Sequence, residues 1–257
     1  MSGPHVTRLT LEYDGREFAG WATQPGRRTV QEELERALAV VLRRGPTSGS
    51  FLTVAGRTDA GVHALAQVAS YEGALVPAHK LNTLLPHDVA VIDARSAPPG
   101  FSARHDATSR AYRYRVLARR MRGPHERGRA LWHSRPLDAD ALDACAAALH
   151  GIHDFTAFTP TDTIHTRFRR EVRTARWRRE GDVLAFEIEA DSFMRNMNRV
   201  LVATMLEVGA GRRTLRDFVA LLDGAPRERA GATAPAHGLY LVGIGYDGRP
   251  VLEPSIR

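Results

Sequence analysis

The stretch "GRTDAGVHA", Gly56 to Ala64, places one carboxylate, Asp59, between an arginine and a glycine turn, and it holds no cysteine, no serine and no second acid. An Asp-x-Gly sequence most often marks a turn in which the aspartate caps backbone amides, so the stretch alone leaves a structural role open. It lacks the lysine and the hydroxyl residue of a phosphate-binding loop. His63 lies four residues after Asp59, which leaves open an acid–base pair of these two side chains.

The chain around this stretch predicts a mixture of strands and helices. Before residue 107 we expect strands at 6–15, 51–61 and 66–72, a helix at 29–43, and a short helix followed by a strand at 81–97. Thr29 and Glu32 have the spacing of a capping box at the start of the helix. An apolar stripe follows them at Val30, Leu34, Leu38 and Val41.

The second half of the chain repeats this mixture. We expect a strand at 110–118, a helix at 138–151 capped by Asp138, a hairpin at 174–190, helices at 192–209 and 214–224, and a closing strand at 238–246. Alternation puts Tyr112, Tyr114 and Val116 on one face of the first strand, and Leu184, Phe186 and Ile188 on the buried face of the hairpin. Because strands and helices do not alternate strictly, we predict the α+β class with a mainly antiparallel sheet, in two domains at 1–106 and 107–257.

Composition limits the classes of protein. The formal charge is +7 and the isoelectric point about 10.2, and only one basic residue, Lys80, is a lysine. The positive charge favours a polyanionic partner, although the arginine bias is equally explained by genome composition. The lone cysteine, Cys145, excludes an intramolecular disulfide and a cysteine-cluster zinc site. The amino terminus does not resemble a signal peptide and no apolar run is long enough to span a membrane, so we expect a cytoplasmic protein.

Beyond the opening stretch, motifs along nearly the whole chain resemble one family, the transfer-RNA pseudouridine synthases of the TruA type. "GRTDAGVHA" is similar to the signature of that family. The likeness continues, in order, through "LEYDGREFAGWATQP" (11–25), "FSARHDATSRAYRYRV" (101–116), "GIHDFTAFT" (151–159), "SFMRNMNRVLVATMLEVGAG" (192–211) and "ATAPAHGLYLVGIGY" (232–246).

The resemblance implies a fold, a reaction and partners. The fold is two ferredoxin-like-type halves with a joined central sheet, flanking helices and a catalytic cleft between the halves. The reaction converts uridine to pseudouridine at positions 38 to 40 of the transfer-RNA anticodon stem-loop, without a cofactor or a metal ion. The enzyme of this family is a homodimer.

The resemblance also assigns roles to four residues. Asp59 is the nucleophile that forms a covalent bond with the base or with the ribose, and the choice between these two routes stays open. A nucleophilic carboxylate must stay ionised while enclosed, and a neighbouring cation favours that form. Arg199 is implied as that cation, with Arg195 expected one turn earlier on the same helix face. Tyr112 lies against the flipped target base, and Arg57 fills the place that the base has left.

Two rival functions remain at this stage. An inactive RNA-binding protein on the same scaffold would keep the basic surface without the chemistry. A hydrolase would use Asp59 together with His63, with or without a metal ion. The arginines at 119–129 and 167–179 are candidates for phosphate contacts under the primary hypothesis.

Overall fold

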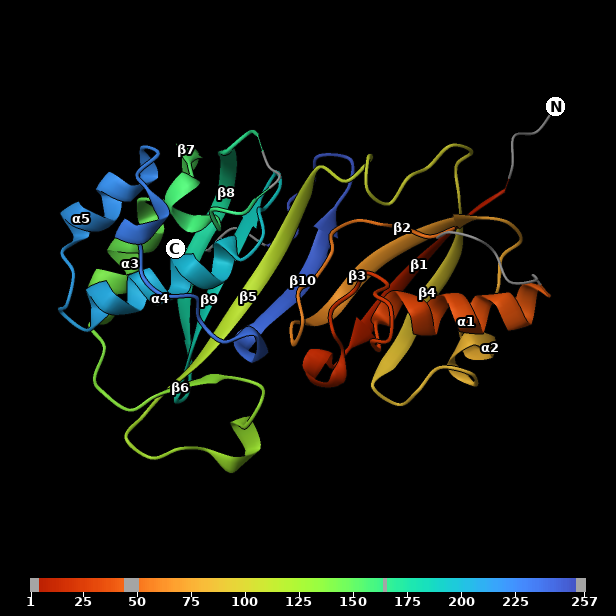
Figure 1. Cartoon of the computed structure of the whole chain (residues 1–257), viewed down its shortest axis with the longest axis horizontal. Coiled ribbons are helices and arrows are strands. Elements are labelled where there is room, and N and C mark those ends of the chain that lie inside the picture. The colour runs from red at the N-terminus through yellow and green to blue at the C-terminus, as the bar shows by residue number, and fades with distance from the viewer. Residues whose placement is uncertain (1–4, 44–50, 164–165, 253–257) are drawn as a thin grey trace. The chain divides into compact units, whose positions relative to one another are not determined.

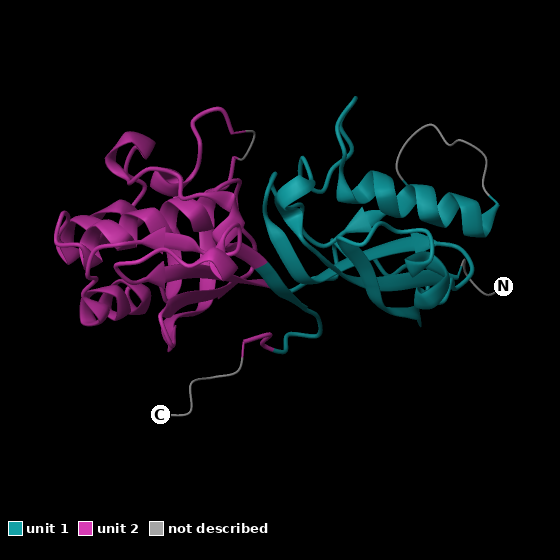
Figure 2. Ribbon diagram, turned by 90° about the horizontal axis from the view of Figure 1, so that it is seen from below, with its two compact units in different colours: residues 1–108, 241–249 teal, residues 109–240, 250–257 magenta. Residues whose placement is uncertain are grey.

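The computed structural model describes residues 5–43, 51–163 and 166–252. Its internal contacts divide the chain into two compact units, shown in Figure 2. Unit 1 comprises residues 1–108 and 241–249, and unit 2 comprises residues 109–240 and 250–257. The segment 241–249, near the end of the chain, thus belongs to the first unit.

Unit 1 is built on a sheet with the strand order β4-β1-β3-β10, and β2 pairs with β3. The strands are β1 (Val6–Tyr13), β2 (Thr53–Val54), β3 (His63–Glu72), β4 (Val89–Ala97) and β10 (Leu239–Gly245). β3 and β4 both pair antiparallel with β1, and β2 pairs antiparallel with β3. Helix α1 (Val30–Leu42) lies along this sheet in Figures 1 and 2, and the short helix α2 (Ala78–Asn82) precedes β4.

The predicted cap at Thr29 and three of the four apolar positions of α1 are confirmed, whereas Val41 is only half-buried. The Thr29 hydroxyl accepts a hydrogen bond from the Glu32 amide, which satisfies one of the unpaired donors of the first turn. Val30, Leu34 and Leu38 are fully buried. These side chains fix the face that α1 turns toward the core of unit 1.

Unit 2 has the strand order β5-β9-β8-β7, with β6 beside β5. The strands are β5 (Ser109–Ala118), β6 (Leu131–His133), β7 (Gly151–Asp154), β8 (Arg169–Glu180) and β9 (Val183–Ala190). These strands pair antiparallel, except for the parallel pair of β5 and β6. Figure 1 shows α3 (Ala139–Ala147), α4 (Met197–Gly209) and α5 (Leu215–Val219) gathered together beside this sheet. The α+β class with a mainly antiparallel sheet is confirmed.

The two faces of β9 differ from the expectation. Leu184, Phe186 and Ile188 are buried as predicted, but so is the other face of the strand, which carries Glu187 and Glu189. The sequence pattern does not reveal that arginines cover Glu187 and that the chain near residue 251 covers Glu189. Alternation alone had predicted one solvated face.

Helix α4 begins later than expected. Its first residue is Met197, and the preceding Asn196 has a left-handed backbone (φ 62°), so residues 192–195 lie before the helix. Arg195 is therefore not on the helix face with Arg199, and it forms an ion pair with Asp162 instead. Among the described residues, none of the helices combines the length and the apolar character needed to cross a bilayer.

Candidate functional site

Asp59 lies in the loop that connects β2 to β3 in unit 1, and its side chain is half-buried. The Val62 amide donates to the Asp59 carbonyl at 3.1 Å and closes the turn after it. On either side of Asp59, the Trp21 amide donates to the Thr58 carbonyl (3.0 Å) and the Gly61 amide donates to the Phe18 carbonyl (3.3 Å). The segment at residues 11–25 therefore supports the Asp59 loop through backbone hydrogen bonds, and it is called the supporting segment below.

Two glycines of the supporting segment allow it to approach the Asp59 loop closely. Gly20 has φ +102°, and a Cβ atom there would lie 2.8 Å from the Thr58 carbonyl oxygen and 3.2 Å from the Asp59 carbonyl carbon. A Cβ atom at Gly15 would lie only 2.0 Å from the Val62 carbonyl oxygen. Any other residue at these positions would push the loop away, so both glycines help to position Asp59.

A series of buried hydrogen bonds from β1 and β3 also supports the Asp59 loop. The Tyr13 and Thr58 hydroxyl groups are 2.8 Å apart, and Gln67 Nε2 donates to Tyr13 Oη (3.3 Å) and to the Gly56 carbonyl (2.7 Å). Burial raises the pKa of Tyr13 to about 12, although the hydrogen bonds with Thr58 and Gln67 act in the opposite direction. Tyr13 is therefore a neutral hydroxyl at physiological pH, and it holds the residue next to Asp59.

Replacing Tyr13 with phenylalanine removes one hydroxyl from these buried hydrogen bonds and leaves the packing of the aromatic ring in place. We expect the free energy of unfolding to fall by about 1–2 kcal/mol because a buried partner is lost. Under the role that the resemblance implies for Asp59, we expect kcat to fall about 10-fold, because a small displacement of a reacting group is enough to slow a reaction. Urea denaturation and steady-state turnover measure the two effects.

Tyr71→Phe is the matched control, because it removes another buried hydroxyl of unit 1, one that bonds to the Ala74 carbonyl. It should lower stability to a similar extent while leaving kcat close to that of the wild type. Equal turnover in the two variants would contradict a positioning role for Tyr13.

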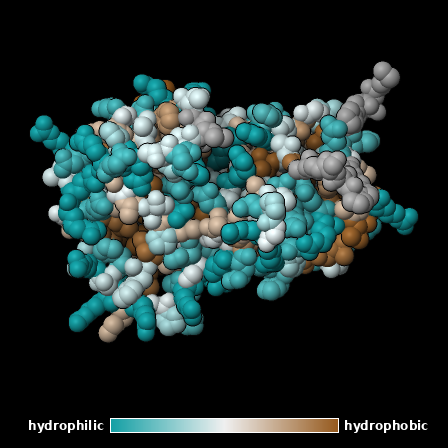
Figure 3. All heavy atoms as spheres, in the orientation of Figure 1, coloured by the Kyte–Doolittle hydropathy of each residue, from teal (hydrophilic) through white to brown (hydrophobic). Residues whose placement is uncertain are grey.

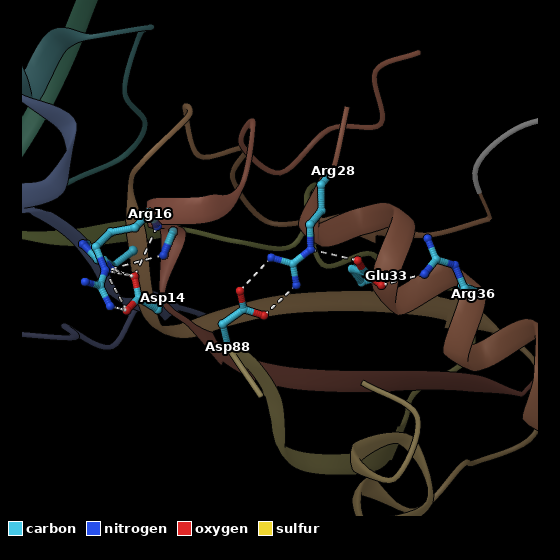
Figure 4. A network of polar contacts seen from close by, with 8 residues as sticks. Asp14, Arg16, Arg28, Glu33, Arg36 and Asp88 are labelled. Carbon is cyan, nitrogen blue, oxygen red and sulfur yellow. Dashed lines mark hydrogen bonds and ion pairs between the residues drawn. The ribbon is translucent and has the colours of Figure 1, made fainter. Parts of the chain in front are cut away.

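The supporting segment is itself held in place by the polar contacts shown in Figure 4. The Asp14 amide donates to the Asp88 carbonyl at 2.9 Å, and Arg28 holds the Asp88 carboxylate through two bonds of 2.7 and 2.8 Å. Arg28 also bonds to Glu33 at 3.1 Å. Asp88 thus ties both ends of the segment 14–28, and the hydrogen bonds from Arg28 hold the pKa of Asp88 below its usual range.

The lowered pKa of Asp88 makes this contribution dependent on pH. A depressed pKa stabilises the fold above the pKa of an unfolded aspartate, about 3.9, and the contribution is lost as the pH falls through the folded value. We expect Asp88→Asn to lower the free energy of unfolding by about 1 kcal/mol at pH 7. Urea denaturation at pH 7 and below pH 4 should show the difference from the wild type shrinking at the lower pH. A difference that stays constant would contradict the assignment.

His63 is engaged by other groups than Asp59. Its Nδ1 atom accepts a hydrogen bond from the Gly15 amide at 3.2 Å and lies 3.3 Å from the Asp14 carboxylate. The ring is buried at the start of β3. These contacts join His63 to the segment 11–25, and they favour a structural role for His63 over that of an acid–base partner of Asp59.

Arg57 and the Asp59 carboxylate remain open to a ligand within unit 1. Arg57 is exposed, two residues before Asp59 on the same loop. In the described part of unit 1, neither side chain makes a hydrogen bond or an ion pair. The loop is therefore held through its backbone and through Thr58, which leaves the functional groups of Arg57 and Asp59 uncommitted.

In unit 2 the structure orders Arg199 in the first turn of α4. Its Nε donates to the Ala234 carbonyl at 2.6 Å, and its Nη1 donates to Asn196 Oδ1 at 2.8 Å. These two bonds engage Nε and Nη1 of a half-buried guanidinium group. Asn196, in its left-handed conformation, therefore both starts the helix and orients Arg199.

Two tyrosines of β5 lie on the same face of the strand, and their roles differ. Tyr112 is 8% exposed and packs edge-on against Phe193, with ring centroids 5.0 Å apart. Tyr114 is fully buried, and its hydroxyl donates to the Pro235 carbonyl at 2.8 Å. Burial raises the pKa of Tyr114 far above its ordinary value, while the nearby charge of Arg199 acts to lower it. The structural role expected of Tyr114 fits these contacts, and Arg199 and Tyr114 share the 234–235 segment.

Comparison with known proteins finds relatives of this chain in one family. A family model described as tRNA pseudouridine synthase matches residues 145–247. A tRNA pseudouridine synthase A of Thermus thermophilus is 44% identical over 93% of this chain and 95% of its own length. Those of Frankia casuarinae and Limosilactobacillus fermentum are 44% and 39% identical, each over 95% of this chain and over 90% and 96% of their own lengths.

The chain belongs to the tRNA pseudouridine synthase A family. The alignment with its relatives in this family extends through both units, so membership applies to the whole chain and not only to the Asp59 loop. A chain of a solved Cbf5–Nop10–Gar1 complex superposes with a TM-score of 0.32 at 9% identity over 91% of this chain and 57% of its own length, a likeness too slight to carry an argument.

Several supporting residues of the candidate site were not predicted from the sequence. They are Tyr13, Gly15, Gly20, Thr58, Gln67 and Asn196. Each acts through a contact with a residue distant in sequence or through an unusual backbone angle, and only the glycines and Asn196 belong to residue types that suggest such a role.

Proposed function

We propose that this protein is a transfer-RNA pseudouridine synthase that uses Asp59 as its nucleophile. In this reaction the bond between N1 of uracil and C1′ of the ribose is replaced by a bond between C5 and C1′. C5 loses a proton and N1 gains one, so no water or redox equivalent is consumed. The observation that carries the proposal is the identity of about 40% with tRNA pseudouridine synthases A over nearly the whole chain.

The Asp59 loop supports this chemistry. A carboxylate that forms and later releases a covalent bond needs a fixed position and an uncommitted oxygen. The loop is fixed by the backbone contacts at Thr58 and Gly61 and by the close approach of Gly20. We leave both routes in place, attack on the base and attack on C1′ of the ribose, because each ends with the carboxylate restored.

Three further residues complete the proposed site. Tyr112 is assigned to the face of the flipped uracil, and Arg57 to the position that the base vacates in the RNA. Arg199 is assigned as the ion-pair partner of Asp59. Its two hydrogen bonds within unit 2 engage Nε and Nη1 and leave the Nη2 group for a carboxylate, which supports that role.

The finer parts of the proposal follow from the resemblance to the family. We propose positions 38 to 40 of the anticodon stem-loop as the target, and two ferredoxin-like-type halves whose joined sheets border a catalytic cleft. The domain carrying the Asp59 motif would end near residue 106, and the domain from 107 to 257 would complete the cleft. We also propose a cofactor-independent enzyme that acts as a homodimer in the cytoplasm.

One assay separates this function from its rivals. The purified protein is incubated with unmodified transfer RNA, and the RNA is digested to nucleosides and analysed for pseudouridine and for free uracil. We expect pseudouridine without free uracil. Free uracil would indicate a hydrolase, and unchanged uridine at a high enzyme concentration would indicate an RNA-binding protein without the chemistry.

A further inference from the structure

The segment from Arg119 to Arg135, here called the basic lobe, concentrates the positive charge of the protein. It contains six arginines and one glutamate, a formal charge of +5, whereas the whole chain has +7. The rest of the chain therefore contributes only +2. The six arginines are Arg119, Arg120, Arg122, Arg127, Arg129 and Arg135.

The basic lobe is an ordered part of unit 2. Its strand β6 pairs in parallel with the end of β5, and Ala130 packs with Leu117 and Val183 in a small buried cluster. The Tyr240 hydroxyl donates to the Arg129 carbonyl at 2.9 Å. In Figure 1 the lobe is the green loop at the lower edge of this unit, and Figure 3 shows hydrophilic side chains projecting there. Its arginines therefore start from a fixed backbone, which reduces the entropy lost on binding.

The acid within the basic lobe and one acid beside it are already paired with arginines. Glu126, the only acidic residue of the lobe, is held by Arg115 of β5 at 2.8 and 3.0 Å. Arg119 bonds to Asp182 at 2.9 Å. By contrast, the side chains of Arg120, Arg122 and Arg127 are exposed and have no recorded hydrogen bond or ion pair within the described residues of unit 2. These three guanidinium groups are available to an anionic partner.

Elsewhere in unit 2 the arginines are used differently. Arg113 and Arg176 each bond to the buried carboxylate of Glu187 at 2.7 Å, and Arg178 lies 3.4 Å from it. The pKa of Glu187 is lowered, because the hydrogen bonds from these arginines outweigh the effect of its burial. Some of the sequence candidates at 167–179 are therefore structural, and the basic lobe is the better candidate for phosphate contacts.

An exposed aromatic ring accompanies the arginines. Trp132 is 46% exposed, and its indole nitrogen donates to the Arg119 carbonyl at 3.0 Å. This bond orients the ring while leaving much of it in solvent. An oriented aromatic side chain within a cationic surface is typical of proteins that stack unpaired bases.

The basic lobe lies at a distance from the residue assigned to the target base. Trp132 of the lobe pairs with Leu117 on β5, and Leu117 is five residues from Tyr112, which corresponds to about 17 Å along the strand. An RNA that meets Tyr112 with its target nucleotide would therefore meet the lobe with a different part of its backbone. Contacts there affect binding and not the chemical step.

We propose that the basic lobe is a second RNA-contact surface, which binds phosphates of the transfer RNA outside the target nucleotide and stacks an unpaired base on Trp132. This inference rests on the proposed function for the identity of the RNA. Charge complementarity selects the partner, since the charge of the lobe is concentrated and its own acid is already paired.

The test compares two triple variants with the same net charge. Arg120→Gln, Arg122→Gln and Arg127→Gln are combined in the lobe variant. Arg212→Gln, Arg216→Gln and Arg229→Gln, at exposed positions elsewhere in unit 2, are combined in the control. The dissociation constant for unmodified transfer RNA is measured by fluorescence anisotropy at several salt concentrations, and pseudouridine formation is measured separately under single-turnover conditions.

For the lobe variant we expect a dissociation constant raised about 10-fold or more, and a salt dependence whose slope is reduced by about 2–3. The single-turnover rate at saturating transfer RNA should stay within about twofold of the wild type, because the chemical step is not altered. Transfer RNA should also quench tryptophan emission in the wild type, and less in Trp132→Phe.

Two outcomes separate failure of this inference from failure of the proposed function. If both triple variants bind transfer RNA with the affinity and salt slope of the wild type, the basic lobe is not an RNA-contact surface. If the wild type makes no pseudouridine but its binding still depends on the lobe, the contact surface stands and the catalytic proposal fails.

Discussion

Replacing Asp59 with asparagine should reduce the rate of pseudouridine formation by about four orders of magnitude or more, since loss of a nucleophile removes the covalent route altogether. Asparagine has nearly the same shape as aspartate, and the loop is held by backbone bonds at Thr58 and Gly61, which the substitution leaves in place. The change therefore removes the charge of the carboxylate without disturbing the fold. Single-turnover assays with excess enzyme measure the rate of the chemical step.

The control for this variant is Asp93→Asn, which neutralises an exposed carboxylate on β4 of the same unit. It should keep the turnover of the wild type. Transfer RNA should bind Asp59→Asn with about the affinity of the wild type, because most of the binding energy comes from phosphate contacts. Turnover by Asp59→Asn within 10-fold of the wild type would contradict a nucleophilic role.

Replacing Arg199 with leucine should lower kcat by about 100- to 1,000-fold, because the cation proposed to stabilise the Asp59 carboxylate is lost. The dissociation constant for transfer RNA should change much less. Arg195→Leu is the control, since Arg195 is exposed, lies four residues earlier and pairs with Asp162. A rate for Arg199→Leu equal to that of Arg195→Leu would contradict the assignment.

Arg199→Lys separates the charge of Arg199 from its structural role. A lysine keeps the positive charge but cannot hold both the Ala234 carbonyl and Asn196 Oδ1 as the guanidinium group does. We expect the lysine variant to recover part of the turnover lost in the leucine variant while both unfold at similar temperatures. Equal turnover in the two variants would show that Arg199 acts only by holding residues 196 and 234.

Local patterns predicted most of the secondary structure. The cap at Thr29 and the stripe at Val30, Leu34 and Leu38 were sufficient for α1, because a helix end and a helix face depend on residues close in sequence. The predicted helix at 214–224 likewise begins with a local signal, since Thr214 and Asp217 form a capping box at the start of α5. These elements are specified by their own residues.

Errors arose where distant parts of the chain decide the outcome. Glu187 and Glu189 looked solvated because the arginines and the segment near residue 251 that cover them are remote in sequence. The start of α4 was placed too early because the left-handed conformation of Asn196 is not evident in an apolar run. The short strands β6 and β7 were not predicted, because each is defined by its pairing with another strand and not by a pattern of its own.

The candidate site likewise combines a residue that a local motif indicates with supporting residues that only the structure reveals. Asp59 could be singled out only through the resemblance of its motif, because an isolated Asp-x-Gly also fits an ordinary turn. The dependence of its loop on Gly15, Gly20 and Tyr13 required the structure, since these contacts join residues more than 35 positions apart. The structure thus explains why the motif at residues 11–25 accompanies the motif at Asp59.

The most direct test of the central claim is to map pseudouridine at nucleotide resolution on one unmodified transfer RNA after incubation with the wild type and with Asp59→Asn. We predict pseudouridine at one or more uridines of the anticodon stem-loop with the wild type, and none there with the variant. Equal modification of those uridines by both proteins would show that the carboxylate of Asp59 does not perform the reaction.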